Sequence, residues 1–276
     1  MTLFPAKILS LSLLVLSGWA HGRAPVSYHG LVEPERDVLL SPAVAGRIDV
    51  LHHREGDRVE EGALLMELDS KVEKLEVARR KTVLEDMTEL NASRQREALL
   101  KEELESTRAL AERTGSVSRE ELNRKELEAV LAGLEVSRLE QAKIREEIEL
   151  NIARERLALQ RILAPFAGII AQLPQDEGES VQPNQPVLRL IADDHANLMV
   201  NVPARIARRL NIGDPVRLRF HLEDEVEKEG KVDFVSPVVD PASGLRKVRL
   251  RFDNREAPRV EPGVSGEWML PEGLHE

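Results

Sequence analysis

The longest continuous pattern of apolar and polar positions runs from Lys71 to Gln160, a stretch without proline in which nearly every second residue is charged. A Gly-Ser step at Gly115 divides it into two runs. Each run of roughly 43 residues would form a helix about 65 Å long at 1.5 Å rise per residue. Two such helices must fold back on one another, so the pattern predicts a long antiparallel helical hairpin.

Both runs begin with a helix start signal. Ser70 is followed three positions later by Glu73, and Ser118 by Glu121. This spacing is typical of a capping box, in which the serine oxygen accepts a backbone N–H and the glutamate reaches back to the serine. Residues 114–117 are then a tight turn between the two helices.

Positions seven apart in the second run, with partners three positions on, are mostly apolar and form a coiled-coil pattern with polar interruptions. We call this contact line the seam; it comprises Leu122, Ala129, Val136, Lys143, Leu150 and Leu157 with Ala132, Leu139 and Ala153. A second apolar line of Leu127, Leu134 and Ile148 is expected beside the seam, where it would thicken the seam or contact a neighbouring hairpin. The apolar residues of the first run fit no single heptad register, so its packing face is not predicted.

Residues 38–69 and 163–194, on either side of the hairpin, alternate short β-prone pieces with turn residues. The two segments repeat one another: 41–48 matches 164–170, and the Glu-Gly-x-x-Val sequence at 55–59 returns at 177–181. This is an internal repeat of about 30 residues per half. A segment of about 30 residues is too small to bury a core alone, so the two halves of the repeat are expected to close on each other as a β-sandwich.

Residues 195–271 read as a third structural unit. Val216 to Phe220 and Val248 to Phe252 alternate apolar residues with arginines, which places one set inward and the other outward on strands. We predict a small antiparallel barrel here, with 23–37 as a linker or first barrel strand and 272–276 as a tail. The fold class is α+β and multidomain, with the hairpin at 70–162 inserted into the split sandwich.

Lys7, the apolar run 8–16 and the small residues that follow indicate a secretory signal peptide over 1–22. The apolar run is shorter than the 20 or so residues that cross a bilayer; retention as an uncleaved N-terminal anchor is the alternative. The chain has no cysteine, which excludes disulfides and a thiol nucleophile. A bacterial periplasm fits an exported chain of this kind.

The net charge of −10 argues against a nucleic-acid partner, because binding to phosphates requires basic patches. We find no glycine-rich phosphate loop, nucleophile elbow or zinc signature. The carboxylates lie in helix-periodic charge runs typical of solvated faces. We therefore expect a chain that is not an enzyme and has no catalytic, cofactor or metal site.

The duplicated proline-to-glycine and Glu-Gly-x-x-Val motifs resemble the two halves of a lipoyl-type domain. A lipoyl-type domain split by a helical hairpin resembles the membrane fusion proteins, the periplasmic adaptors of tripartite efflux and secretion systems, over about Val26 to Leu270. The resemblance implies lipoyl-like halves at 38–69 and 163–194 and a barrel domain at 195–271. Because the chain stops six residues after Leu270, we expect the further membrane-proximal domain of many adaptors to be absent.

The same resemblance implies partners and a location. An adaptor would link an inner-membrane transporter, of RND type ahead of an ABC-type exporter or a type I secretion system, to an outer-membrane channel. It would form a homo-oligomeric ring, with a hexamer among the candidates, in the periplasm of a Gram-negative bacterium next to the inner membrane. A periplasmic coiled-coil scaffold without a transport role is the alternative from another class.

In these adaptors an arginine, a leucine four residues later and a serine seven residues after that bind the hairpin tip to the outer-membrane channel. Ser118 matches the serine, but Ala111 and Thr107 occupy the other two positions, and Arg108 and Leu110 lie nearby out of step. The partner-binding tip that the resemblance implies comprises Arg108, Leu110, Gly115, Ser116, Val117 and Ser118. The alternative role of Ser118 is helix capping alone.

Two further candidates have weaker support. Lys71 follows the first lipoyl-like half, where a lipoyl carrier holds its modified lysine, but about 90 helical residues separate it from the second half, which in a carrier follows at once. His52 and His53 are adjacent, and adjacent strand residues point to opposite faces. The remaining histidines, including His29, His195 and His221, are scattered along the chain, and the methionines do not cluster as a copper site requires.

Overall fold

The computed structural model describes residues 27–222 and 224–270, and its contacts divide the chain into two compact units, 34–195 and 1–33 with 196–276. The predicted signal peptide at 1–22 and tail at 272–276 lie outside the described residues. Among the described residues, no helix combines the length and the apolar character needed to cross a membrane.

The unit formed by 196–276 and the N-terminal segment is a closed barrel in the strand order β1-β10-β13-β12-β11-β14. Its elements are β1 (Ser27–Pro34), β10 (His195–Pro203), α4 (Ala204–Ala207), β11 (Pro215–His221), β12 (Glu225–Val235), β13 (Leu245–Asp253) and β14 (Ser265–Met269). The two ends of the chain close it, because β1 pairs antiparallel with β14 and Tyr28 lies opposite Trp268. The predicted antiparallel barrel is confirmed.

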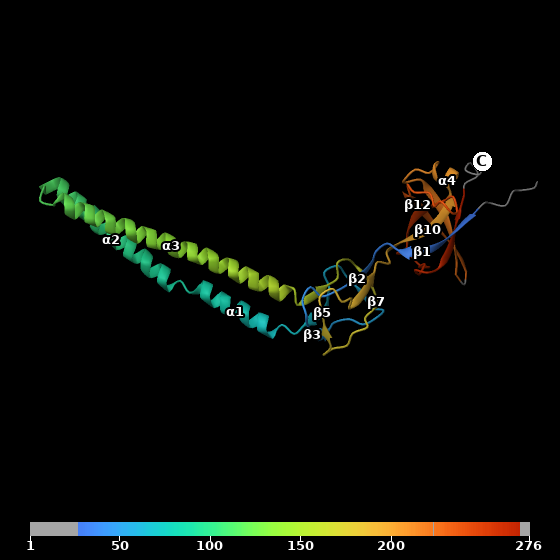
Figure 1. The fold of residues 1–276 in the computed structure, drawn as a ribbon, viewed down its shortest axis with the longest axis horizontal. Helices are drawn as coiled ribbons and strands as arrows, with labels where there is room; N and C mark the ends of the chain where they lie inside the picture. The colour runs from blue at the N-terminus through green and yellow to red at the C-terminus, as the bar shows by residue number, and fades with distance from the viewer. Residues whose placement is uncertain (1–26, 223, 271–276) are drawn as a thin grey trace, which may run out of the picture. The chain divides into compact units, whose positions relative to one another are not determined.

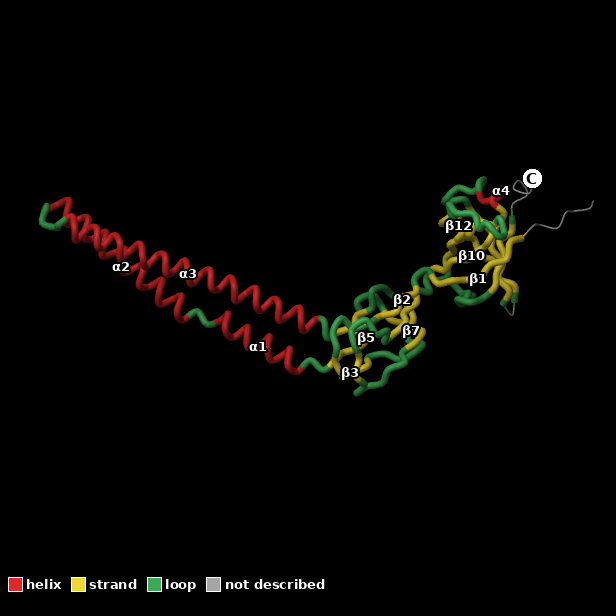
Figure 2. Tube along the Cα trace, in the orientation of Figure 1, coloured by secondary structure: helices red, strands yellow, loops and turns green. Residues whose placement is uncertain are grey.

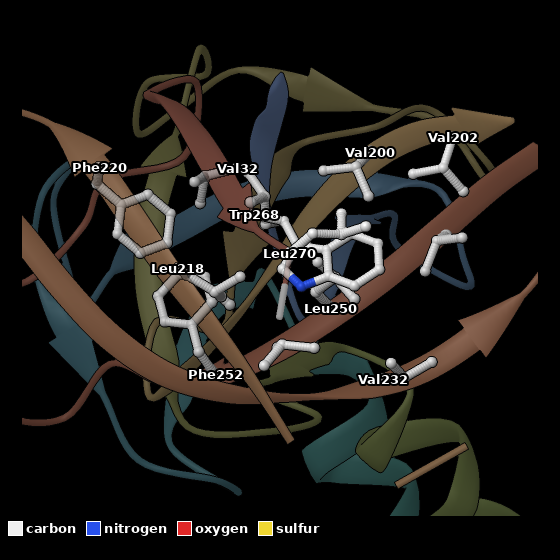
Figure 3. Packing of buried hydrophobic residues seen from close by; sticks show 14 of the residues in the cluster. Val32, Val200, Val202, Leu218, Phe220, Val232, Leu250, Phe252, Trp268 and Leu270 are labelled. Carbon is white, nitrogen blue, oxygen red and sulfur yellow. The ribbon is translucent and has the colours of Figure 1, made fainter. Parts of the chain in front are cut away.

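The barrel is filled by the apolar residues of its alternating strands, as Figure 3 shows. The rings of Phe220 and Phe252 lie 4.8 Å apart in the interior, and Trp268 is fully buried beside them. Full burial of such a side chain contributes about 1.5–3 kcal/mol. Gly266 leaves the necessary room, because a Cβ atom there would lie 2.5 Å from the ring of Phe220.

The second unit contains a sandwich of two four-stranded sheets, ordered β2-β9-β7-β4 and β6-β5-β3-β8. Its strands are β2 (Asp37–Leu40), β3 (Gly46–Leu51), β4 (Arg58–Val59), β5 (Leu64–Leu68), β6 (Arg161–Leu163), β7 (Gly168–Gln172), β8 (Ser180–Val181) and β9 (Leu188–Ile191). Each sheet takes two strands from before the hairpin and two from after it. The two halves of the repeat therefore close on each other as predicted, by exchanging strands.

The Glu-Gly motifs make equivalent contacts across this exchange. Gly56 N donates to Ile170 O, and Gly178 N donates to Ile48 O. The glutamate before each glycine accepts from the opposite half: Glu55 Oε1 from Leu173 N at 2.6 Å and Glu177 Oε1 from Leu51 N at 2.9 Å. Gly56 and Gly178 have φ of +87° and +92°, a conformation that glycine adopts without strain.

The hairpin leaves the sandwich after β5 and returns at β6, and it consists of three helices instead of the predicted two. These are α1 (Lys71–Glu85), α2 (Thr88–Thr114) and α3 (Arg119–Ala158). Figures 1 and 2 show α3 running beside both α1 and α2, with the connection between α1 and α2 drawn as a loop. The prediction of one continuous helix is confirmed for the second run, which is α3. It was wrong for the first run, which is divided into α1 and α2.

The break lies at Asp86 and Met87. Asp86 has an extended ψ of 100°, and its Oδ1 accepts from Thr88 N at 3.0 Å. Aspartate side chains compete with the helix for backbone N–H groups in this way, which ends one helix and starts the next. The carbonyls of Val83 and Leu84, at the end of α1, accept from Lys143 Nζ of α3.

Of the two predicted serine caps, one is present in the structure and the other is not. Ser118 Oγ accepts from Glu121 N at 3.1 Å, so the serine cap of α3 is present. Ser70 makes no side-chain capping bond, and the prediction there was wrong. Asp69 takes over its place, because Asp69 Oδ1 accepts from Lys71 N.

Most of the predicted seam is buried in the hairpin. Six of its residues are buried: Ala129, Ala132, Val136, Leu139, Leu150 and Ala153. Leu122, Lys143 and Leu157 are half-buried. Leu90 of α2 joins Val136 and Leu139 in a small core, which gives the two helices a fixed contact.

Candidate functional site at the hairpin tip

The tip of the hairpin is a short turn that local chemistry determines. Gly115 follows α2 with φ 65° and ψ 8°, and its N–H donates to Ala111 O at 2.9 Å. This left-handed conformation is the common helix C-cap, and glycine adopts it without a steric penalty. Ser118 then caps α3, so the predicted turn residues Gly115 to Ser118 lie together between the two helices.

The tip presents hydroxyl groups to solvent. Thr114 Oγ1 and Ser116 Oγ lie 2.6 Å apart, and Ser118 is exposed. The capping bond uses the Ser118 oxygen only as an acceptor, so its O–H proton remains able to donate to an acceptor on a partner. Helix capping and partner binding by Ser118 are therefore compatible.

Arg108 and Leu110 do not share a face. Arg108 donates to Glu105 Oε1 at 2.9 Å and to Glu126 Oε1 of α3 at 3.0 Å. Leu110 is exposed, and two positions along a helix correspond to a turn of about 200°. Of the six predicted tip residues, the structure brings four together in the turn, holds Arg108 against α3 and leaves Leu110 on another side of α2.

Ion pairs between α2 and α3 hold the helices together below the tip. Lys125 Nζ lies 2.7 Å from Glu103 Oε2, and this hydrogen bond raises the pKa of the lysine. A second ion pair between the two helices joins Arg94 Nη2 of α2 and Glu140 Oε1 of α3 at 2.7 Å. Exposed pairs of this kind contribute little individually, so the pattern aligns the helices more than it stabilises them.

The second apolar line lies on the opposite side of α3 from the seam, which corrects the expectation that it lies beside it. Leu127 is two positions from Ala129, and that spacing turns a side chain about 200° away. Leu134, for example, is 61% exposed. We call this surface the outer stripe; it comprises Leu127, Val130, Leu131, Leu134, Ile144, Ile148 and Ile152, all exposed. The outer stripe therefore does not thicken the seam.

Lys71 and the adjacent histidines lie in ordinary surface surroundings. Lys71 is exposed at the first position of α1, with its Nζ 3.6 Å from Asp69 Oδ2. His52 lies near Glu67 and His53 near Asp57, so the two histidines have different carboxylate neighbours. The structure does not bring these two side chains to a common site.

Two of the histidines that are scattered in the sequence meet on the barrel. His29 of β1 and His221 of β11 both lie against Glu267 of β14. Their distance in the sequence does not reflect their distance in space, because closure of the barrel places β1 and β11 on either side of β14. Strand alternation alone would have placed each of them outward, but the sequence carries no local signal for their proximity.

The chain combines a split two-sheet sandwich that carries a helical hairpin with a closed barrel that follows it in the sequence. The family model described as "RND MFP, barrel-sandwich hybrid domain" matches residues 36–192, which is more than half of the chain. A second, described as "CusB-like, beta-barrel domain", matches residues 198–272. The chain belongs to the membrane fusion proteins, as its motifs predicted.

Similar proteins of known sequence or structure agree with this family. The multidrug resistance protein MdtA of Xenorhabdus bovienii is 25% identical over 235 residues, which cover 82% of this chain and 53% of that protein. The chain thus spans about half the length of the curated relatives it matches.

Two solved structures share the fold. MacA from Actinobacillus actinomycetemcomitans superposes with a TM-score of 0.66 at 19% identity, covering 89% of this chain and 78% of that one. A membrane fusion protein from Streptococcus pneumoniae R6 has a TM-score of 0.62 at 15% identity, with 89% and 98% covered.

Proposed function

We propose that this chain is a periplasmic adaptor that joins an inner-membrane transporter of RND type to an outer-membrane channel in a tripartite efflux complex. In this role the chain performs no chemistry: the transporter supplies the energy, and the adaptor supplies reach and coupling. It would be exported to the periplasm of a Gram-negative bacterium and remain next to the inner membrane.

The observation that carries the proposal is the way the hairpin is held. Its two ends join β5 and β6, which are neighbours in one sheet and pair Leu64 with Leu163 and Met66 with Ile162. Both arms of the helical hairpin thus start from one sheet. The turn at 115–118 lies at the opposite end of the hairpin, and its serines are exposed. A long element with a rigid base and a polar tip is suited to docking on a distant partner.

The outer stripe supports a ring of several copies. An exposed line of leucine, isoleucine and valine side chains along α3 leaves apolar surface in water, and burying each such side chain would contribute about 1.5–3 kcal/mol. A second hairpin of the same chain, packed side by side, is the occupant we propose. Hexamers are one stoichiometry that such packing can form.

The function is tested by photo-crosslinking in intact cells. A photoreactive residue is placed at Val117 in the tip turn, at Lys247 on the barrel surface, and at Lys101 in the middle of α2 as a control for the hairpin. We expect an outer-membrane channel captured from position 117, an inner-membrane transporter from position 247, and no channel from position 101. Mass spectrometry of the captured proteins identifies them.

The identity of the captured transporter separates the two export systems. An RND transporter would support the proposal as stated, whereas an ABC-type exporter would keep the adaptor role and change the energy source. Absence of both partners, in cells that make the chain at normal levels, would contradict the adaptor role and favour a coiled-coil scaffold.

A further inference from the structure

Three potential ligand side chains gather on the outer wall of the barrel. In β14, Glu267 lies directly opposite His29 of β1 and directly opposite Arg219 of β11. His221 is two residues beyond Arg219 and therefore on the same face. The neighbouring residues Trp268 and Phe220 point inward, so the two histidines and the glutamate face outward.

The distances suit a small cation. Glu267 Oε1 lies 2.9 Å from His221 Nε2 and 3.4 Å from His29 Nδ1, and the three ligand atoms all lie within 4.8 Å of one another. Ligand atoms about 2.0–2.1 Å from a tetrahedral zinc ion are separated by about 3.4 Å. Two of the three separations are thus close to that value already, and rotation of the exposed His29 ring can adjust the third.

The charges around the group are also suitable. Glu267 is the acidic residue that lies against both histidines, so the group combines one carboxylate with two imidazoles. Arg219, which lies directly opposite Glu267, is directed to β12, where it pairs with Glu227 at 3.1 Å and lies near Glu225. The guanidinium of Arg219 is therefore paired with the glutamates of β12 and not with Glu267.

We propose that His29, His221 and Glu267 form a binding site for a divalent transition-metal ion, with Zn²⁺ the best match. Two imidazoles and one carboxylate are ligands that zinc accepts, and they leave a fourth position for water or for a group on another protein. Hard cations such as Mg²⁺ prefer sites of oxygen atoms alone. A bound ion would connect β1 to β11 across β14, at the point where the two ends of the chain close the barrel.

The site is independent of the proposed adaptor function and is tested on the purified, chelator-stripped full chain. Titration with zinc sulfate in a calorimeter, and in competition with a chromophoric chelator, measures stoichiometry and Kd. We expect one zinc per chain with a Kd in the micromolar range or tighter, no competition from magnesium, and a rise in Tm of about 3 °C or more at saturating zinc.

Variants show whether these residues are the ligands. His29→Ala, His221→Ala and Glu267→Gln should each weaken zinc binding about tenfold or more. The control is the double variant His52→Ala/His53→Ala, which removes two imidazoles from the sandwich and should leave the Kd within twofold. X-ray absorption of the zinc-loaded wild-type chain should show two imidazole ligands and does not depend on how any variant folds.

The proposal would be overturned by the absence of saturable zinc binding at concentrations up to about 100 µM, a Kd that corresponds to only about −5.5 kcal/mol. It would also be overturned by an unchanged Kd in the His29 and His221 variants, or by loss of binding in the His52/His53 control. An absorption spectrum without imidazole ligands would overturn it as well.

Discussion

Lys143 of α3 donates from its Nζ to the carbonyl oxygen of Val83 in α1 at a distance of 3.0 Å, and it lies 3.4 Å from the carbonyl of Leu84. Lys143 is also the one charged residue of the seam, where the heptad pattern would otherwise place an apolar side chain. It lies where α1 ends and α2 has not yet begun. The polar interruption of the seam therefore matches the break in the opposite helix, since a helix end needs partners for its last carbonyls.

The first prediction concerns this contact. Lys143→Met keeps the length and the helix propensity of the side chain but removes the donor, so the carbonyls at the end of α1 lose their partner at a cost of about 1–2 kcal/mol. Hydrogen exchange of the amides at 84–88 should become about 5–30 times faster. Lys81→Met, which removes only an exposed pair with Glu85, is the control; equal acceleration in both variants would contradict a capping role for Lys143.

The second prediction concerns the two motif glutamates of the sandwich. Glu55→Ala and Glu177→Ala each remove one hydrogen bond to the backbone of the opposite half, and each should reduce the free energy of unfolding by about 1 kcal/mol. The equivalence of the two contacts predicts similar losses, measured by chemical denaturation. Glu60→Ala, at a nearby exposed position, should have little effect; a loss confined to one of the two motif variants would show that the halves are not energetically equivalent.

The third prediction compares two leucines on opposite sides of α3. Leu139 is 7% exposed in the seam, and Leu139→Asp places an unpaired charge there, which should cost about 3 kcal/mol or more and reduce helical circular dichroism. Leu134→Asp, on the outer stripe, should change the stability of the monomer by less than about 1 kcal/mol.

The same pair of variants tests the ring. Native mass spectrometry should show that Leu134→Asp dissociates the oligomer although the hairpin remains folded. Monodisperse monomers of the unmodified chain, with and without its transporter, would contradict assembly through the outer stripe. Normal melting of Leu139→Asp would contradict the seam.

The fourth prediction concerns the tip. Val117→Asp changes a half-buried residue of the turn and should leave helicity and Tm unchanged, but it should abolish export by the complex because it alters the surface proposed to contact the channel. Val72→Asp makes the same chemical change at the exposed start of α1 and should retain export. Cellular resistance to the exported compounds and accumulation of a fluorescent substrate measure both; export at normal levels by Val117→Asp would exclude the tip from the mechanism.

Sequence patterns alone predict the elements whose signals are local. The Glu-Gly motifs predict paired turns because the glycines need positive φ, and the strand-exchanged sandwich contains those turns at Gly56 and Gly178. The alternation of apolar residues and arginines predicts β11 and β13, since a strand presents successive side chains to opposite faces. The heptad of α3 predicts the seam, and Ser118 predicts the start of α3.

Features that depend on residues far apart in the chain become visible in the folded structure and not in any local pattern. The break at Asp86 needs Lys143 from another helix to satisfy the carbonyls that it frees, and a sequence window around Asp86 does not contain that lysine. His29 and His221 meet at Glu267 because β1 and β14 close the barrel, which is a pairing between the two ends of the chain. Contacts of this kind follow from how whole elements pack, whereas sequence patterns report the periodicity within a single element.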